Sequence, residues 1–304
     1  MLGGLEAGGT KFICVVGSSP DDIRLSERIE VGGPTATIHA ALEVFRAALQ
    51  DGLPIRALGI GSFGPLELRP GHPAFGSITT TPKPGWRGTD IVGPFRETFG
   101  LPIGFDTDVN AAALGEGRWG AARGLRSFVY LTVGTGIGGG AVVDGRVAHG
   151  MVHPEMGHVA VARYPGDDYP GRCPFHGDCL EGMGSGPAIG ARFGHRAEDL
   201  AGVDRERAVD LAAFYLAAGV RSLTYALAPE RVVVGGGLST MPGLLERARS
   251  FLDDQLAGYP GLPEHASPDY LVPAGLGGMA GPAGTLALAE AALADATPDT
   301  IAPA

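Results

Sequence analysis

Hydrophobic residues near the start of the chain fall in short runs that glycine interrupts. A strand ending near Leu5 and a second strand from Phe12 to Val16 flank a Gly-containing turn at residues 7–10, and this pattern predicts a hairpin. After the hairpin in the sequence, apolar residues recur at helical spacing, which predicts a helix through Ile38, Leu42, Phe45 and Leu49.

The next apolar run predicts a buried strand at Ala57–Ile60, followed by a long Gly- and Pro-rich loop that contains TTTPKPGW and ends at Trp86. A loop of this length inside a compact protein usually binds a ligand. A helix at Ile91–Phe99 and a strand at Leu101–Phe105 are expected next. The strand leads into a polar segment at 106–110 and then an alanine-rich helix.

A second hairpin, Phe128–Val143, repeats the plan of the first with the turn sequence VGTGIGGG, which suggests two related folds. The valines of Val232–Val234 predict a buried strand that runs into the glycine segment Gly235–Leu238 and then a helix. The alanine-rich segment 280–294 predicts a terminal helix, and the last ten residues are expected to be frayed.

The chain has 304 residues, of which 44% are hydrophobic, enough to bury a large core in two lobes. A net charge of -10 and the absence of basic runs argue against nucleic-acid binding. No apolar stretch reaches the roughly 20 residues needed to span a bilayer, and the first residues do not resemble a signal peptide. Together with an odd, sparse set of three cysteines, this predicts a cytoplasmic protein in a reducing compartment, with no membrane partner.

Each of the three glycine segments, taken alone, is explained by ordinary turns. Two in hairpins and one opening a helix are better explained by a polyphosphate, because backbone N–H groups can approach its oxygens closely where no Cβ intervenes. Gly9, Thr10 and Lys11 offer N–H, hydroxyl and ammonium donors, although Lys11 could equally be a solvated charge. Neither a P-loop nor a Rossmann fingerprint is present.

Asp106, Thr107, Asp108 and Asn110 follow a predicted strand and open a helix. One of these side chains could cap that helix, but capping would account for only one of the four polar residues. The carboxyl end of a strand is where open α/β sheets bind ligands. Asp108 is therefore a candidate general base for phosphoryl transfer, which requires a hydroxyl to be oriented and its proton accepted.

Residues 153–158 read HPEMGH, which does not fit a zinc protease motif because its histidines are five apart and Pro154 and Gly157 disfavour a helix. Glu155, His158 and Glu181 instead supply the acceptors and donors that a buried polyhydroxylated ligand needs. The alternative is that these are scattered polar residues on the surface, an explanation that fits Glu181 best.

Cys173, His176 and Cys179 lie at i, i+3 and i+6 in a turn-rich stretch, a spacing that suits tetrahedral zinc. His158 is the natural fourth ligand, with His153 and Asp178 as weaker candidates, and four protein ligands make the site structural. The alternative is a pair of unrelated thiols. If zinc binds one ring nitrogen of His158, the other can donate to a sugar hydroxyl.

Taken together, these motifs resemble the ROK sugar kinases, most closely their bacterial fructokinase branch. The resemblance runs nearly end to end and is carried by EAGGTK, TPKPGW, DTDVNAAALGE, VGTGIGGG and the Glu155-x-Gly-His158 element with its Cys-His-Cys cluster and Glu181. It implies an α/β fold of the two-lobed, actin-like ATPase (ribonuclease H-like) type with an inserted zinc-binding loop. The lobes are expected at 1–117, completed by helix 280–294, and at 118–279, with the zinc-binding segment at 153–181.

The resemblance also implies the roles of the site residues. Asp108 becomes the base that serves transfer from MgATP to a hexose 6-hydroxyl, and Glu155, His158, Glu181 and Thr107 become sugar contacts. Glu6 and Asp108 become candidates for holding Mg²⁺. The implied nucleotide contacts are Gly9, Thr10, Lys11, Thr135, Gly136, Pro187, Gly235, Gly236, Gly237 and Leu238.

Three departures from the family pattern matter. Glu6 stands where many relatives of this fold carry Asp, His176 replaces a cysteine of the wider family's zinc motif, and Thr107 stands where the family's glucokinases usually carry Asn. The last two point toward D-fructose. The alternatives are a ROK hexokinase for glucose or mannose, a noncatalytic sugar sensor, or a zinc hydrolase, which would need an open metal position. The family's repressors carry an added DNA-binding module, for which no room is expected here, and the family suggests a homodimer.

Overall fold

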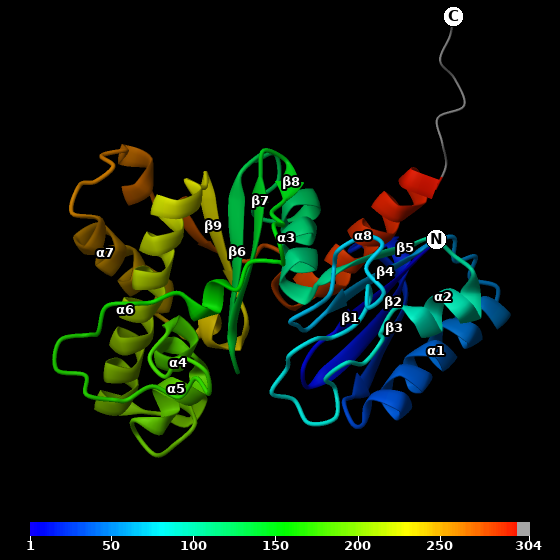
Figure 1. Cartoon of the computed structure of the whole chain (residues 1–304). Coiled ribbons are helices and arrows are strands. Elements are labelled where there is room, and N and C mark those ends of the chain that lie inside the picture. The colour runs from blue at the N-terminus through cyan, green and yellow to red at the C-terminus, as the bar shows by residue number, and fades with distance from the viewer. Residues whose placement is uncertain (297–304) are drawn as a thin grey trace, which may run out of the picture. The chain divides into compact units, whose positions relative to one another are not determined.

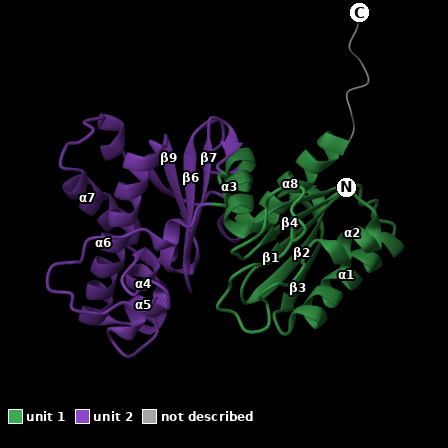
Figure 2. Ribbon diagram, viewed as in Figure 1, with its two compact units in different colours: residues 1–119, 149–153, 279–304 green, residues 120–148, 154–278 purple. Residues whose placement is uncertain are grey.

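In a computed structural model, residues 1–296 are described and form two compact units (Figure 1, Figure 2). Unit 1 contains residues 1–119, residues 149–153 and the C-terminal residues from Met279 onward, and unit 2 contains residues 120–148 and 154–278. Residues 149–153 thus cluster with unit 1, although the zinc-binding segment expected at 153–181 was assigned to the larger lobe. The predicted frayed end lies almost wholly outside the described residues.

Unit 1 is built on a five-stranded sheet in the order β3-β2-β1-β4-β5. Strands β1, β2 and β3 pair antiparallel, whereas β4 and β5 run parallel to β1. Its strands are β1 (Leu2–Ala7), β2 (Lys11–Ser19), β3 (Asp22–Glu30), β4 (Leu58–Ser62) and β5 (Ile103–Thr107), and its helices are α1 (Pro34–Gln50), α2 (Gly93–Phe99), α3 (Asp108–Trp119) and α8 (Ala280–Ala296).

Unit 2 is built on a second five-stranded sheet, in the order β10-β9-β6-β7-β8. Its strands are β6 (Phe128–Val133), β7 (Ile137–Val143), β8 (Arg146–Val147), β9 (Arg231–Gly235) and β10 (Leu271–Pro273). Its α-helices are α4 (Leu180–Gly184), α5 (Gly186–Ala191), α6 (Gly202–Leu227) and α7 (Leu244–Leu256), and 3₁₀ turns occur at Met156–His158, Ala197–Asp199, Gly237–Thr240, Pro263–Ala266 and Gly277–Met279.

The two sheets have the same topology. Each begins with an antiparallel meander of three strands, and each then adds two parallel strands on the other side of the first strand. The sequence prediction of an α/β fold made of two related halves is therefore confirmed. Strands β3, β8 and β10 were not predicted; β3 is an edge strand whose residues are mostly half-buried or exposed, so it lacks a clear apolar face.

Neighbouring glycines of β1 show how helices cover both faces of the unit 1 sheet. A Cβ on Gly3 would meet Phe45 of α1, whereas one on Gly4 would lie 2.1 Å from the Thr285 hydroxyl of α8. Successive strand residues point to opposite faces, so α1 and α8 lie on opposite sides of the sheet. The α8 backbone comes so close that a Cβ on Gly59 would lie 1.8 Å from the Thr285 carbonyl oxygen.

The core of unit 1 adds two details to the sequence analysis. In α1 the buried stripe includes Ala48, while Leu49 is 39% exposed. Trp86, which ends the long loop, is fully buried against Phe12 and Phe63, and its indole N–H donates to the Gly32 carbonyl at 3.2 Å. Most of the TPKPGW loop thus stays outside the core, but its tryptophan anchors it there.

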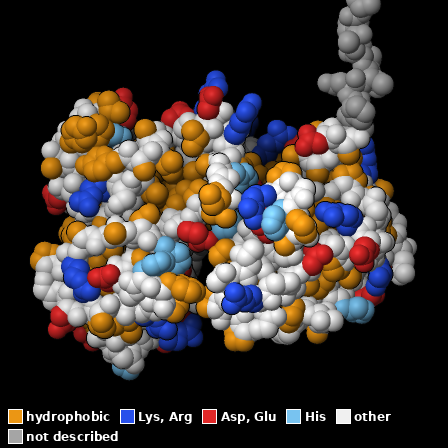
Figure 3. Space-filling model, viewed as in Figure 1, with side chains coloured by type: hydrophobic (Ala, Val, Ile, Leu, Met, Phe, Trp, Pro, Cys, Tyr) orange, Lys and Arg blue, Asp and Glu red, His pale blue; other side chains and the backbone are white. Residues whose placement is uncertain are grey.

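Among the described residues, no helix is long and apolar enough to cross a membrane. On the face shown in Figure 3, basic side chains lie among acidic ones instead of forming one broad basic surface, in keeping with the net charge of -10.

Candidate functional site

The register of the unit 1 sheet brings acidic residues together at one end, here called the acidic end. Glu6, Gly61 and Asp106 are aligned across β1, β4 and β5, so their side-chain positions share the face covered by α3 and α8. Gly61 lets the start of α3 pack closely on this row, since an added Cβ would lie 2.8 Å from the Ala111 methyl group and 3.5 Å from the Asp108 Cα. On the same face, a Cβ on Gly281 would lie 2.1 Å from a Glu6 carboxylate oxygen.

At the start of α3, the helix cap and the candidate base are different residues. β5 extends to Thr107, two residues further than the sequence predicted, and α3 begins at Asp108. The Thr107 hydroxyl accepts the Asn110 N–H at 3.1 Å and caps the helix. The Asp108 carboxylate accepts the neighbouring Val109 N–H at 2.9 Å, and no side chain of another described residue donates a hydrogen bond to it. The cap is therefore supplied by Thr107, and Asp108 keeps free acceptor capacity.

Asp106 is fully engaged within unit 1. Its carboxylate accepts the Thr107 N–H at 2.8 Å and the Asn110 amide at 2.7 Å, and the His149 Nε2 lies 2.9 Å from its other oxygen. The hydrogen bond to Asp106 raises the pKa of His149. This buried carboxylate holds His149 beside the start of α3.

The two remaining carboxylates of this end, those of Glu6 and Asp108, both have raised pKa values. Burial raises the pKa of Asp108 to about 6. Burial, and next the charge of Asp108, raises the pKa of Glu6 to about 7, while Lys11 acts in the opposite direction. Both acids are only partly exposed, and each would be stabilised in its charged form by a cation.

The turn of the first hairpin spans residues 8–10, with Thr10 exposed at its tip. The Gly8 N–H donates to the Lys11 carbonyl at 3.0 Å. From the TPKPGW loop, the Lys83 ammonium donates to the Gly9 carbonyl. The long loop thus braces the predicted phosphate turn of unit 1.

The turn of the second hairpin, Gly134–Gly136, carries Thr135 exposed at its tip. The Ile137 N–H donates to a Glu181 carboxylate oxygen at 3.0 Å, and the Gly186 N–H donates to the first carbonyl of the turn at 2.8 Å. Residues of the α4–α5 segment therefore hold this turn.

A cavity of about 1410 Å³ lies within unit 2. Thr135, Pro187, Gly237 and Leu238, all predicted to contact a nucleotide, line it, together with Arg172 and Arg205. Its volume is ample for a nucleotide.

The third glycine segment does not open an α-helix as predicted. It leads into the 3₁₀ turn at Gly237–Thr240, and α7 begins only at Leu244. Gly235 is required by packing, because a Cβ there would lie 2.3 Å from the Tyr130 hydroxyl. Gly236 has φ +87° beside the Val133 backbone, a conformation that favours glycine.

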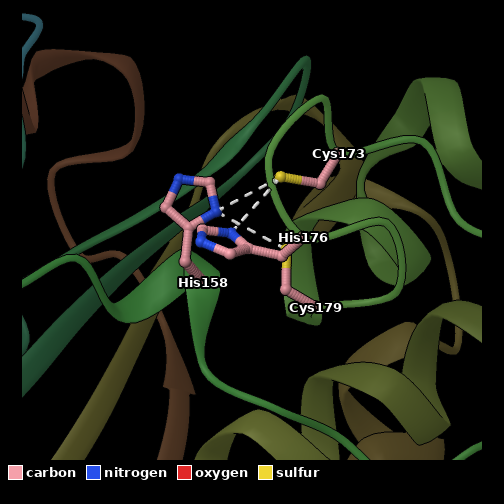
Figure 4. A group of neighbouring side chains, drawn as sticks. All are labelled: His158, Cys173, His176 and Cys179. Atoms are coloured by element: carbon pink, nitrogen blue, oxygen red, sulfur yellow. Dashed lines mark hydrogen bonds between the residues drawn. The ribbon is translucent and has the colours of Figure 1, made fainter. Parts of the chain in front are cut away.

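His158, Cys173, His176 and Cys179 converge in unit 2, with all their ligand atoms within 4.8 Å of one another (Figure 4). Nδ1 of His158 lies 3.6 Å from the Cys173 sulfur and 3.5 Å from the Cys179 sulfur, and Nδ1 of His176 lies 3.6 Å from the Cys173 sulfur. Burial raises the pKa of the Cys179 thiol to about 11, because it disfavours the charged thiolate. A cation at this point would stabilise the thiolate. These four side chains could hold one metal ion.

The weaker candidates for this cluster lie elsewhere. His153 clusters with unit 1, where its Nε2 accepts the Leu66 N–H at 2.9 Å. Asp178 forms an ion pair with Arg163 at 2.9 Å. The structure therefore brings together the first four predicted ligands and not these two.

The predicted sugar contacts are split between the units. Thr107 belongs to unit 1, whereas Glu155, His158 and Glu181 belong to unit 2. Glu155 is exposed, and its carbonyl accepts the His158 N–H at 3.0 Å. Because Nδ1 of His158 faces the sulfurs, its Nε2 points away from the cluster (Figure 4).

The contacts of Lys83, His149 and Arg172 were not predicted. A lone histidine 43 residues from Asp106 gives no sequence signal. Lys83 lies in the loop already expected to bind something, and Arg172 directly precedes the first cysteine of the metal-ligand spacing, so both positions carried a usable hint.

Comparisons with known proteins agree with this arrangement. The sequence profile described as "ROK family" matches residues 2–292. The chain is 43% identical over 297 residues to a putative fructokinase of Bacillus subtilis, covering 96% of both chains. It is likewise 43% identical to a fructokinase of Zymomonas mobilis, covering 96% of this chain and 97% of that one. Among solved structures, the ROK hexokinase of Thermus thermophilus superposes with a TM-score of 0.79 at 31% identity, covering 97% of this chain and 99% of the other.

Proposed function

Because the chain belongs to the ROK family, we propose that it is a fructokinase, which transfers the γ-phosphoryl group of ATP to the 6-hydroxyl of D-fructose and releases fructose 6-phosphate and ADP. The observation that carries this is the free carboxylate of Asp108 at the end of β5, next to a threonine that supplies the helix cap. The names of relatives at 43% identity support fructose as the acceptor.

Asp108 acts as the general base. Its carboxylate accepts the proton of the fructose 6-hydroxyl as the hydroxyl oxygen forms a bond to the γ-phosphorus, and the bond from that phosphorus to the β-γ bridging oxygen breaks. A pKa of about 6 suits this task, because the group is ionised at neutral pH and still accepts a proton readily. The Val109 N–H fixes the orientation of the carboxylate.

The nucleotide binds in the cavity of unit 2, against Thr135, Pro187, Gly237 and Leu238. The turn at 8–10 of unit 1, with Thr10 and Lys11, contacts the phosphates, and Gly136, Gly235 and Gly236 allow close approach of backbone to ligand. Mg²⁺ bound with ATP would neutralise charge on the phosphates. Glu6 and Asp108 fit this ion, because burial raises the pKa of both carboxylates and a cation would stabilise their charged forms.

The sugar is held by Glu155, His158 and Glu181, with Thr107 as a further contact. The hydroxyl of Thr107 uses an acceptor position for the helix cap and can still donate its proton to the sugar. Glu181 keeps one carboxylate oxygen after accepting the Ile137 N–H. His158 can donate from Nε2 while Nδ1 binds a metal.

The metal of the Cys/His cluster is zinc, in a structural role. Zn–S bonds of about 2.3 Å and Zn–N bonds of about 2.05 Å, at tetrahedral angles, separate sulfur from nitrogen by about 3.6 Å. The sulfur–nitrogen separations of 3.5 to 3.6 Å among these side chains fit that geometry. Four protein ligands leave no open position for a zinc hydrolase.

Units 1 and 2 correspond to the two lobes of such a kinase. The cytoplasm suits a chain whose three cysteines form no disulfide and in whose described residues no membrane-spanning helix is found. The protein would act as a homodimer, as the family suggests.

A second candidate function is a ROK hexokinase of broader specificity for glucose or mannose. The ROK hexokinase from Thermus thermophilus shares the fold at 31% identity and so favours retaining this alternative. A noncatalytic sugar sensor is a third candidate, but such a sensor has no need of the free, raised-pKa carboxylate of Asp108.

A coupled assay of ADP release with fructose, glucose, mannose and N-acetylated hexoses, with and without chelator, tests the proposal. Fructose should give the highest kcat/KM, and Asp108→Asn should abolish most of the turnover. A preference for another hexose would replace fructose as substrate, and no sugar-dependent ADP release would overturn the kinase.

A further inference from the structure

Glu181 lies between two features of unit 2 that the proposed function treats separately. It sits in the first turn of α4, two residues after the cluster residue Cys179, and its side chain reaches the turn at Gly134–Gly136. The Ile137 N–H donates to Glu181 at 3.0 Å, although Ile137 itself is only 5% exposed. A buried N–H without a partner is costly, so this acceptor fixes where the turn ends.

The contact between Glu181 and the turn is close. A Cβ on Gly136 would lie 2.6 Å from the same carboxylate oxygen that accepts the Ile137 N–H. A side chain at residue 136 would therefore have to displace this carboxylate from its place beside the Ile137 N–H. The Gly186 N–H, from the start of α5, holds the other side of the turn through the Gly134 carbonyl at 2.8 Å.

The position of α4 is set by the cluster. The Met183 N–H donates to the Cys179 carbonyl at 3.0 Å, so the helix opens on a cluster residue. The Leu180 N–H donates to the Val159 carbonyl at 3.0 Å, which ties the same point to the residue after His158.

Arg172 makes a second connection on the other side of the cluster. It precedes Cys173, its N–H donates to the Gly182 carbonyl at 3.1 Å, and its guanidinium donates to the Pro187 carbonyl at 3.2 Å. Both Arg172 and Pro187 line the cavity. Each end of the loop that carries the metal ligands is thus joined to a wall of the cavity.

We infer that Glu181 is a positioning residue for the nucleotide: it transmits the fixed geometry of the Cys/His cluster to the phosphate turn at 134–136, whatever it also contributes to sugar binding. A carboxylate beside nucleotide phosphates is electrostatically unfavourable, so its value there lies in the oxygen that accepts the Ile137 N–H. The inference rests on the proposed function only in taking the cavity ligand to be a nucleotide.

The test measures binding of MgADP to the full chain by calorimetry without sugar, so it does not depend on phosphoryl transfer. Glu181→Ala should weaken MgADP binding about tenfold or more, since a hydrogen bond to a charged group is lost and a buried N–H is left unpaired. Glu181→Gln keeps an acceptor oxygen and should bind MgADP at least as tightly as the unaltered protein. Glu155→Ala, the matched control for a sugar contact, should leave MgADP binding within about twofold.

Unaltered MgADP affinity in Glu181→Ala would overturn the inference, and so would equal weakening in Glu181→Gln and Glu181→Ala. If Glu181→Ala does not fold, Glu181→Asp serves, because it keeps the charge but withdraws the oxygen from Ile137. Hydrogen exchange at the Ile137 amide should then be faster in Glu181→Asp than in Glu181→Gln, and equal exchange would contradict the inference.

Metal removal tests the coupling itself. Chelation should weaken MgADP binding in the unaltered protein and cause much less further weakening in Glu181→Ala. Metal removal and the substitution both interrupt the same connection between the cluster and the turn at 134–136, so their effects should not add. Equal effects of chelation in the two proteins would refute the coupling. A protein that binds MgADP as expected but releases no ADP with any hexose would contradict the proposed kinase and leave this inference standing.

Discussion

The two glycine hairpins occupy the same place in two sheets of the same strand order, yet they are braced by different chemistry. In unit 1 the turn at 8–10 is held by the Lys83 ammonium from a long loop. In unit 2 the turn at 134–136 is held by Glu181, two residues after the metal-ligand candidate Cys179. The unit 1 hairpin adjoins the free carboxylates, whereas the unit 2 hairpin adjoins the cavity. Equivalent turns are thus held by a lysine from a long loop in one unit and by a glutamate close to the metal-ligand cluster in the other.

The largest expected effect comes from removing the base of unit 1. Asp108→Asn should lower kcat by at least about 10²-fold, the usual contribution of a positioned base, and should weaken MgADP binding much less, because Glu6 remains to hold the Mg²⁺. Steady-state kinetics and calorimetry measure the two quantities. A comparable loss of nucleotide affinity would show that Asp108 serves binding as much as proton transfer.

Next is the metal cluster of unit 2. Cys179→Ser should remove the bound metal and, with it, about 4 kcal/mol of stability if the free metal normally exceeds its Kd about a thousandfold. That corresponds to a fall in Tm of about 10 °C. Elemental analysis and thermal melts check this. Cys14→Ser, a buried thiol in unit 1 outside the cluster, is the control and should retain the metal.

The same Asp108→Asn change should stabilise unit 1 at alkaline pH. Burial raises the Asp108 pKa from 3.8 to about 6, so the folded chain binds this proton more tightly and loses stability as pH rises through about 6. The neutral amide avoids this cost, which is at most about 3 kcal/mol and less where water reaches the carboxylate. In thermal melts, the Tm of Asp108→Asn should exceed that of the unaltered protein at pH 8, and this difference should be much smaller at pH 4. An equal Tm for both proteins at pH 8 would contradict the raised pKa.

The brace of the unit 1 hairpin should matter less. Lys83→Met removes a charge-assisted hydrogen bond to the Gly9 carbonyl and should raise KM for MgATP by up to about tenfold. Lys83→Arg should restore part of the affinity. If Lys83→Met leaves KM unchanged while Glu181→Ala raises it, only the unit 2 hairpin needs its brace.

The smallest effect is expected at the helix cap. Thr107→Val should cost about 1 kcal/mol of stability through loss of the cap on α3, whereas Thr107→Ser should retain it. Denaturant unfolding measures the difference. If Thr107 also contacts the sugar, KM for fructose should rise in Thr107→Val, and an unchanged KM would leave Thr107 as a cap alone.

Local spacing made much of this site predictable. Cys173, His176 and Cys179 lie within seven consecutive positions of the chain, and Asp108 follows an apolar run, so neighbouring residues alone indicated both features. The choice of Thr107 as the cap could not be made from sequence, because it depends on β5 extending to that residue.

Contacts between distant residues were not visible in the pattern. His149 meets Asp106, and Ile137 meets Glu181, only because the sheets and α4 bring them together. Helix α6 was missed although its apolar spacing, with Leu211, Tyr215 and Leu216 on the buried side, gave a usable signal. The glycines of β4 also had a use that spacing does not reveal, since Gly59 admits the backbone of α8.

The most direct test of the central claim is ³¹P NMR of the product formed from MgATP and D-fructose by the unaltered protein and by Asp108→Asn. The account predicts fructose 6-phosphate and an equal amount of ADP from the unaltered protein, at a rate at least about 10²-fold above that of Asp108→Asn. Fructose 6-phosphate formed at the same rate by both proteins would contradict Asp108 as the base, and no phosphorylated sugar from either would contradict the kinase.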